Sequence, residues 1–92
     1  MARLTEEEIG QALEDAEGWT REREAIVKDF ERADFMGSVG LVNDIAPVAE
    51  EVGHHPDLSI SWDTVTVTIS THSEGGLTQA DFDLAARIDD LG

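Results

Sequence analysis

Every histidine of the chain lies in one stretch, Glu50–His72. His54 and His55 are adjacent near its start, and His72 ends it. An imidazole titrates close to neutral pH, so it can both donate and accept a proton under physiological conditions. The chain has no cysteine, and it carries neither a glycine-rich phosphate loop nor a serine-centred motif. These residues favour general acid/base catalysis over covalent catalysis.

Two short segments with alternating apolar residues separate the adjacent histidines from His72. A period of two is typical of half-buried antiparallel strands, and Asp63-Thr64 is the expected turn between them. That turn places His55 opposite His72, and opposed residues have Cβ atoms roughly 5 Å apart. The pattern therefore predicts that all three imidazoles meet at one end of one hairpin. The apolar positions are Leu58, Ile60, Trp62, Val65, Val67 and Ile69.

Glu50 precedes His54 by one helical turn, near the predicted end of a helix. The two side chains can meet there, and a carboxylate in that position orients an imidazole and favours its charged form. Glu51 is expected to be a solvated surface charge. A metal site is the first rival, because His and Glu are common ligands. Adjacent histidines in an extended segment point apart, and no HxH or HxxxH spacing occurs, so no metal site is predicted.

Several motifs resemble those of the pterin-4a-carbinolamine dehydratase family. The most specific is Glu50-x-x-x-His54-His55-Pro56, and Ser70-Thr71-His72 follows it. The resemblance covers nearly the whole chain. Its other elements are Trp62, Gly76-Leu77-Thr78-x-x-Asp81, Gly18-Trp19, the Ala25–Phe30 segment and Asp34-Phe35.

This resemblance implies an enzyme that converts a 4a-hydroxytetrahydropterin to the quinonoid dihydropterin and water without a cofactor. It implies that His54 and His72 are the catalytic acid/base pair and that Glu50 holds a neighbouring imidazole. Family members often carry an acidic residue directly before the histidine pair, where this chain has Gly53. The substrate-binding residues that the resemblance implies are His55, Pro56 and Thr71.

The resemblance also carries an alternative function. Relatives of the family serve as dimerisation partners of transcription factors, so a catalytically silent pterin-binding or regulatory dimerisation module is the second candidate. The intact histidines favour catalysis. Both a biopterin-like compound and a molybdopterin precursor stay open as the physiological pterin.

The order of elements reads as helix, strand, strand, helix, strand, strand, helix. Capping patterns mark the start of each helix, and Gly53 ends the second. Residues 1–92 are expected to form a single two-layer α+β domain, with a four-stranded antiparallel sheet and three helices on one face. The expected N-terminal caps are Thr5 with Glu8, Asp34, and Thr78 with Asp81.

Three positions carry more specific expectations. Pro47 lies inside the long second helix, where it should either kink the helix near Asn43 or split it in two. Trp19 is expected in the core and not in a ligand pocket. Arg87 is either a surface charge or an anion contact near the site.

The formal net charge is −15, from 21 acidic against 6 basic residues. Such a surface repels nucleic acid phosphates and anionic membranes, so direct nucleic acid binding is not expected. Lys28 is the only lysine, and this composition resembles proteins of salt-loving cytoplasms, although an ordinary acidic protein also fits it. The start of the chain shows no secretion leader and no apolar run is long enough for a membrane span, so a cytoplasmic location is predicted.

The expected partners are a small pterin and further copies of the same chain. A small sheet with two edge strands and helices on one face leaves edges and apolar surface to cover. A homodimer or homotetramer is therefore predicted.

Overall fold

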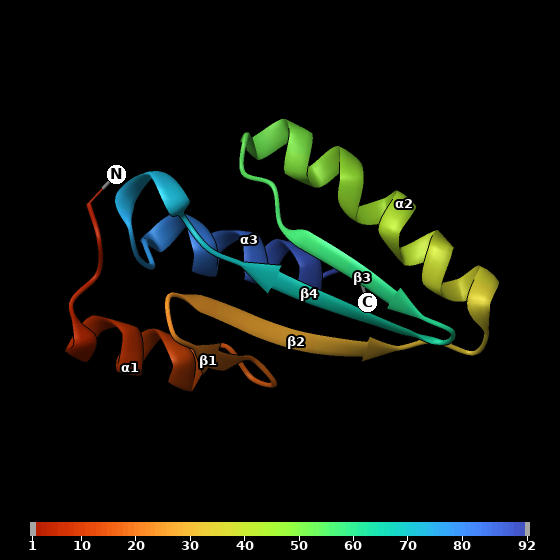
Figure 1. The fold of residues 1–92 in the computed structure, drawn as a ribbon, viewed down its shortest axis with the longest axis horizontal. Helices are drawn as coiled ribbons and strands as arrows, with labels where there is room; N and C mark the ends of the chain where they lie inside the picture. The colour runs from red at the N-terminus through yellow and green to blue at the C-terminus, as the bar shows by residue number, and fades with distance from the viewer. Residues whose placement is uncertain (1, 92) are drawn as a thin grey trace.

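The computed structural model describes residues 2–91, which form three α-helices, a short 3₁₀ helix and four β-strands (Figure 1). This arrangement confirms the predicted α+β fold and its element order. The elements are α1 (Glu6–Asp15), β1 (Thr20–Glu22), β2 (Ala25–Glu31), α2 (Phe35–Val52), β3 (Asp57–Ser61), β4 (Thr64–Ile69), η1 (His72–Glu74) and α3 (Gln79–Asp89).

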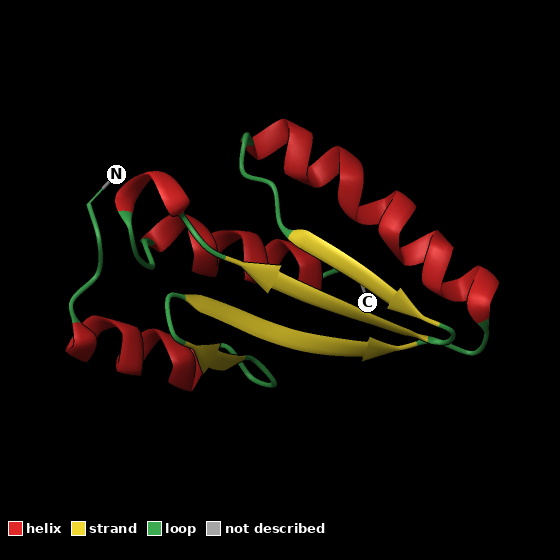
Figure 2. Ribbon diagram, in the orientation of Figure 1, coloured by secondary structure: helices red, strands yellow, loops and turns green. Residues whose placement is uncertain are grey.

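The strands form one antiparallel sheet in the order β1-β2-β4-β3 (Figure 2). In β4, Val65, Val67 and Ile69 are buried, whereas the threonines between them are only partly covered. Successive side chains of a strand point to opposite faces. One face of the sheet therefore carries the core beneath the helices, and the other face is lined by polar side chains.

Local capping interactions begin the first and third helices as the sequence predicts. The Glu8 amide donates to the Thr5 hydroxyl, and the Thr5 amide donates to the Glu8 carboxylate at 2.8 Å. In α3 the Thr78 amide donates to the Asp81 carboxylate, also at 2.8 Å. These contacts satisfy amides that have no partner within their helix.

Helix α2 begins at the predicted cap, because the Gly37 amide donates to Asp34 Oδ1 at 2.8 Å. It ends at Gly53, which adopts a left-handed φ of 70° that glycine tolerates without strain. Pro47 lies within a single helix, so the helix is not split. Among residues 2–91, no helix combines the length and the apolar character needed to cross a lipid bilayer.

The turn of the second hairpin lies one residue earlier than predicted. Ser61 pairs with Thr64, so Trp62 and Asp63 form the turn, and the prediction of Asp63-Thr64 is wrong. Tertiary contacts hold this register, since Ser38 Oγ donates to the Trp62 carbonyl at 2.8 Å and the Arg32 amide donates to the Asp63 carbonyl at 2.7 Å.

The corrected register changes which residue lies opposite His55 in the hairpin. Pairing between β3 and β4 ends at Asp57 and Thr68. Continued by two residues, this register places Ser70 opposite His55, so the predicted pairing of His55 with His72 is wrong.

Trp19 is buried in the core, as predicted, and its ring meets that of Phe30 edge to face. Its indole Nε1 donates to Asp89 at 3.0 Å. Lys28 also donates to Asp89, at 2.8 Å, and to the Glu17 carbonyl at 3.1 Å. The chain's single lysine thus ties β2 to the end of α3.

Candidate active site

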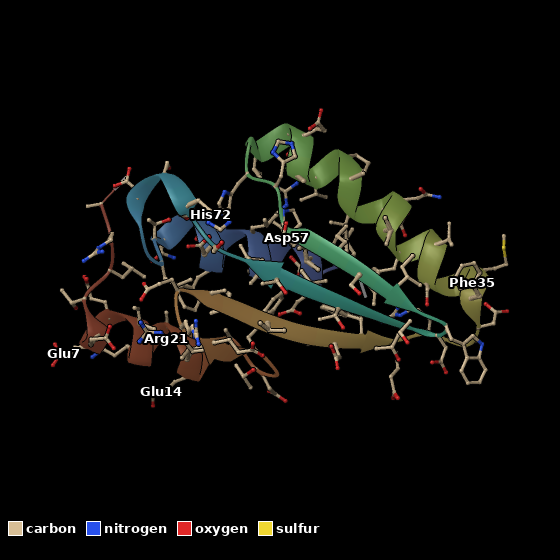
Figure 3. The ribbon with its side chains drawn as sticks, in the orientation of Figure 1. Glu7, Glu14, Arg21, Phe35, Asp57 and His72 are labelled. Carbon is tan, nitrogen blue, oxygen red and sulfur yellow. The ribbon has the colours of Figure 1, made fainter. Side chains whose placement is uncertain are left out.

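The chemistry-bearing side chains gather where α2 ends, β4 ends and α3 begins. The left-handed Gly53 stops α2, and the segment that follows, which is neither helix nor strand, carries His54 and His55. His72 begins the short helix after β4, and Figure 3 shows it far from Phe35, which lies at one end of the molecule. The fold therefore brings together segments that are far apart in the sequence.

His54 pairs with Asp81 from the first turn of α3. Its Nε2 lies 2.6 Å from Asp81 Oδ1. The Asp81 side chain is fully buried, and that of His54 is 18% exposed. Burying a carboxylate costs free energy unless hydrogen bonds satisfy its oxygens. The stability of this pair therefore depends on the other groups that donate to Asp81.

Asp81 has those partners. The Thr78 amide donates to Oδ2 at 2.8 Å, and the Thr71 hydroxyl lies 2.9 Å from both carboxylate oxygens. An ionised carboxylate only accepts hydrogen bonds, so the His54 tautomer that carries its hydrogen on Nε2 is the one that donates to Asp81. In the neutral ring this leaves Nδ1 as the acceptor, free to take a proton from another molecule.

His55 pairs with a different carboxylate. Its Nε2 contacts Glu50 Oε2, and the two side chains are 61% and 75% exposed. The expectation that Glu50 meets His54 is therefore wrong. It is His55, and not His54, that contacts the last turn of α2, which carries Glu50.

The third histidine has a neutral partner. Ser70 Oγ lies 3.2 Å from His72 Nε2, on the exposed side of the segment after β4. Thr71, between them, turns its hydroxyl toward Asp81. The segment thus places one residue against the buried carboxylate and the next imidazole near solvent.

Two hollows adjoin these residues. The one beside His54 has a volume of about 420 Å³ and lies between the end of α2 and the outer side of α3. The one beside His72 has a volume of about 250 Å³ and includes Thr71 and Ser70 in its lining. Small-molecule sites typically span roughly 300–1,000 Å³. The hollow beside His54 falls in this range, and the hollow beside His72 is smaller. His54 and His72 therefore line separate hollows. Thr71, which lines the hollow at His72, donates to Asp81, the carboxylate that contacts His54.

Arg87 lies in the lining of the hollow at His54. One of its guanidinium nitrogens donates to Glu51 at 2.9 Å, and both side chains are largely exposed. Glu51 thus has a cationic partner, and this ion pair joins α2 to α3 beside the hollow. Within residues 2–91, no three His, Cys, Asp or Glu side chains are grouped so that they could hold a metal ion.

The contact that sequence reasoning missed is the one between Asp81 and His54. The sequence identifies Asp81 as a helix cap, and it serves as one. Its second partner lies 27 residues earlier in the chain, and no local pattern links the two. An available signal was that Asp81 belongs to the same set of motif residues as the histidines.

Comparison with known proteins places this geometry in a family. The model of the family described as pterin 4 alpha carbinolamine dehydratase matches residues 2–91. A protein of Nocardia farcinica that carries the provisional name pterin-4-alpha-carbinolamine dehydratase is 48% identical over 88 residues, which is 96% of this chain and 93% of that protein.

Solved structures agree on the fold. The crystal structure of a transcriptional coactivator/pterin dehydratase from Brucella melitensis superposes with a TM-score of 0.92 at 37% identity, over 97% of each chain. A pterin dehydratase-like protein described as a RuBisCO assembly factor of the α-carboxysome superposes with a TM-score of 0.65 at 23% identity, over 79% of this chain and 84% of that one, and so shares the fold alone. The chain belongs to the pterin-4a-carbinolamine dehydratase family.

Proposed function

We propose that this protein dehydrates a 4a-hydroxytetrahydropterin to the quinonoid dihydropterin. The bond between C4a and the hydroxyl oxygen breaks, and a proton delivered to that oxygen produces water. The proton on N5 is removed, and a double bond forms between C4a and N5. No electrons are exchanged with another molecule, so the reaction needs two proton-transfer groups and no redox cofactor.

The observation that carries this proposal is the pairing of His54 with the buried Asp81. A carboxylate that holds one imidazole nitrogen fixes the ring's orientation and stabilises the positive charge that develops when the other nitrogen takes a proton. Asp81 is therefore proposed as the positioning residue of His54. Thr71 and Thr78 support it in turn, because both donate to the carboxylate.

His72 is proposed as the second proton-transfer group. Ser70 contacts its Nε2, and its exposed position leaves the ring accessible to a substrate. Because His54 and His72 line separate hollows, a substrate that uses both must reach from one to the other.

His55 and Glu50 are proposed as substrate-orienting residues. Their pair is exposed at the end of α2, beside the segment that carries His54. Pro56 restricts the backbone directly after the two histidines, since its φ is fixed near −65°. In this role Glu50 acts through His55, and the pair contributes to binding more than to proton transfer.

The alternative function is a module that binds a pterin or a protein partner without catalysis. The family match is compatible with both functions, because one fold can host several. The buried His54 and Asp81 pair favours catalysis because it holds an imidazole in one fixed orientation, as proton transfer requires, in addition to capping α3. A cytoplasmic location accompanies the proposal, because the proposed substrate is a small soluble metabolite.

The test is a dehydration assay with synthetic carbinolamine, using wild type, His54→Ala and His72→Ala. General acid or base assistance from one side chain is typically worth about 10²- to 10⁴-fold in rate, so each variant should lose activity on that scale while its circular dichroism spectrum is unchanged. Wild-type activity should persist in EDTA. Full rates in both histidine variants would contradict the assignment, and loss of activity in EDTA with recovery in zinc would replace it with a metal mechanism.

A further inference from the structure

A hollow of about 480 Å³ lies between α1 and α3, and none of its lining residues is a histidine. The Leu4 amide donates to the Leu77 carbonyl at 2.8 Å, which joins the two segments that precede these helices. Beyond their other ends, Lys28 donates both to the Glu17 carbonyl and to Asp89. The helices therefore begin together, end together and run in the same direction (Figure 1), so the hollow is a groove along both.

The apolar part of this lining consists mostly of small side chains. We name the hollow the α1–α3 groove, and its apolar lining residues are Leu4, Ala12, Ala16, Phe82 and Ala86. Ala12 and Ala16 lie one turn apart along α1, and Phe82 and Ala86 lie one turn apart along α3, so each helix contributes one apolar row. Ala12 and Ala16 are only partly covered, and Ala86 is exposed. Because an alanine side chain ends at Cβ, these rows leave space in which the side chains of another helix can pack.

The polar residues that line the α1–α3 groove are acids and amides, with no base among those that the structure describes. Asp89 already pairs with Lys28. Within the described part of the chain, no cation pairs with Glu8, Asp15 or Asp83, and all three are exposed. Glu8 and Asp15 lie two turns apart on α1, about 10 Å along its axis, and Asp83 lies on α3. Unpaired negative charge therefore lies on both sides of the apolar rows.

This combination of charge and apolar surface determines which occupant fits the groove. A second copy does not fit, because a groove that met itself across a two-fold axis would bring like-charged carboxylates together. A helix with one apolar stripe between two rows of Lys or Arg matches both the apolar rows and the carboxylates. Helix α1 has 10 residues and is therefore about 15 Å long, so it can pack along a partner helix of similar length. Laying an amphipathic helix into a groove is a recurring mode of recognition.

We infer that the α1–α3 groove binds a basic amphipathic helix of another protein. The apolar stripe of that helix lies on the apolar rows, and its Lys or Arg side chains pair with Glu8, Asp15 and Asp83. The inference does not depend on the dehydratase proposal, because a binding measurement tests it without substrate.

Fluorescence anisotropy with a labelled synthetic peptide tests this inference at about 0.1 M KCl, where charges within about 10 Å still interact. The probe is a peptide of Leu and Lys, about 15 residues long, patterned as a helix with one leucine stripe between two lysine rows. Its control is a peptide of the same composition in a scrambled order that has no stripe. The patterned peptide should bind the wild type at least about 10-fold more tightly than the scrambled one, because only it places leucines on the apolar rows.

Two adjacent charge reversals locate the contact. Asp15→Lys should raise the Kd of the patterned peptide at least about 10-fold, because it replaces an attraction with a repulsion inside the groove. Glu14→Lys is the matched control, since it makes the same change of charge on the same helix at an exposed residue outside the groove lining. It should change the Kd less than about 2-fold. Both variants should fold, as thermal unfolding checks, because a cation in the last turn of a helix is favoured by the helix dipole.

Three results would overturn the inference. Equal affinity of the patterned and scrambled peptides would mean that the acidic surface attracts any polycation. Equal effects of Asp15→Lys and Glu14→Lys would place the contact outside the groove. A change of self-association in Asp15→Lys but not in Glu14→Lys, measured by sedimentation velocity without peptide, would assign the groove to a second copy of the chain.

Discussion

His54 and His55 are neighbours in the chain, and each contacts a carboxylate, yet the two pairs lie in opposite environments. Asp81 is completely buried against His54, whereas Glu50 and His55 meet at the surface. Exposed ion pairs typically contribute about 0–1 kcal/mol, whereas removing one partner of a buried pair costs about 3–5 kcal/mol. The same two functional groups, an imidazole and a carboxylate, thus act as a fixed structural unit in one case and as an adjustable surface contact in the other.

The largest expected effect comes from breaking the buried pair at Asp81. Asp81→Ala should lower the free energy of unfolding by about 3–5 kcal/mol, because it leaves the His54 imidazole and the Thr71 hydroxyl without their acceptor. Urea unfolding measures the change. Glu50→Ala is the matched control at the exposed pair, and an equal loss in both variants would mean that burial does not distinguish the pairs.

The buried pair of His54 and Asp81 should respond to salt differently from the charges on the protein surface. Raising KCl from about 0.1 M to about 1 M shortens the Debye length from about 10 Å to about 3 Å, which removes most repulsion among surface carboxylates. The thermal midpoint of the wild type should therefore rise with KCl, while the difference between wild type and Asp81→Ala stays nearly constant. A midpoint that is flat or falls with salt would show that the acidic surface is not an adaptation to high salt.

A smaller effect is expected from the exposed pair. His55→Ala and Glu50→Gln should each change the free energy of unfolding by less than about 1 kcal/mol. In the dehydration assay they should raise KM more than they lower kcat, because both residues are proposed to orient the substrate. A fall in kcat as large as that of His54→Ala would instead place His55 among the proton-transfer groups.

The smallest effect is expected at a third surface contact, between Arg21 and Glu6. The hydrogen bond from Arg21 and its charge lower the pKa of Glu6 below the ordinary 4.5. A lowered pKa stabilises the folded state above the unfolded pKa, and this contribution is lost as the pH falls through the folded value. Arg21→Ala should therefore cause a slight loss of stability at pH 7 that vanishes in acid, measurable by thermal unfolding at both pH values. A loss that persists in acid would point to packing of the arginine.

Much of the fold could be predicted because its determinants are local. The caps at Thr5, Asp34 and Thr78 depend on residues three positions apart, and all three occur as expected. The hairpin turn could not be placed correctly, because alternation of apolar residues fits both Trp62-Asp63 and Asp63-Thr64. Contacts from Ser38 and Arg32, far away in the sequence, decide between them.

In the candidate site too, the residue types could be predicted from the sequence, whereas their tertiary contacts could not. The sequence identifies the histidines and Glu50 as the residues able to do chemistry, and the structure places His54 and His72 in two separate hollows. The sequence alone could not show which carboxylate contacts which imidazole, since Glu50 lies about one helical turn from both His54 and His55. The partner of His54 is supplied by α3, which only tertiary packing brings into contact.

A double-mutant cycle in the dehydration assay tests most directly whether Asp81 acts through His54. The rates of wild type, His54→Ala, Asp81→Asn and the double variant are compared, with folding checked by circular dichroism. If Asp81 contributes only by positioning His54, the double variant should be no slower than His54→Ala, so the two losses are strongly non-additive. Losses that add in full, or an Asp81→Asn variant with the wild-type rate, would contradict the account.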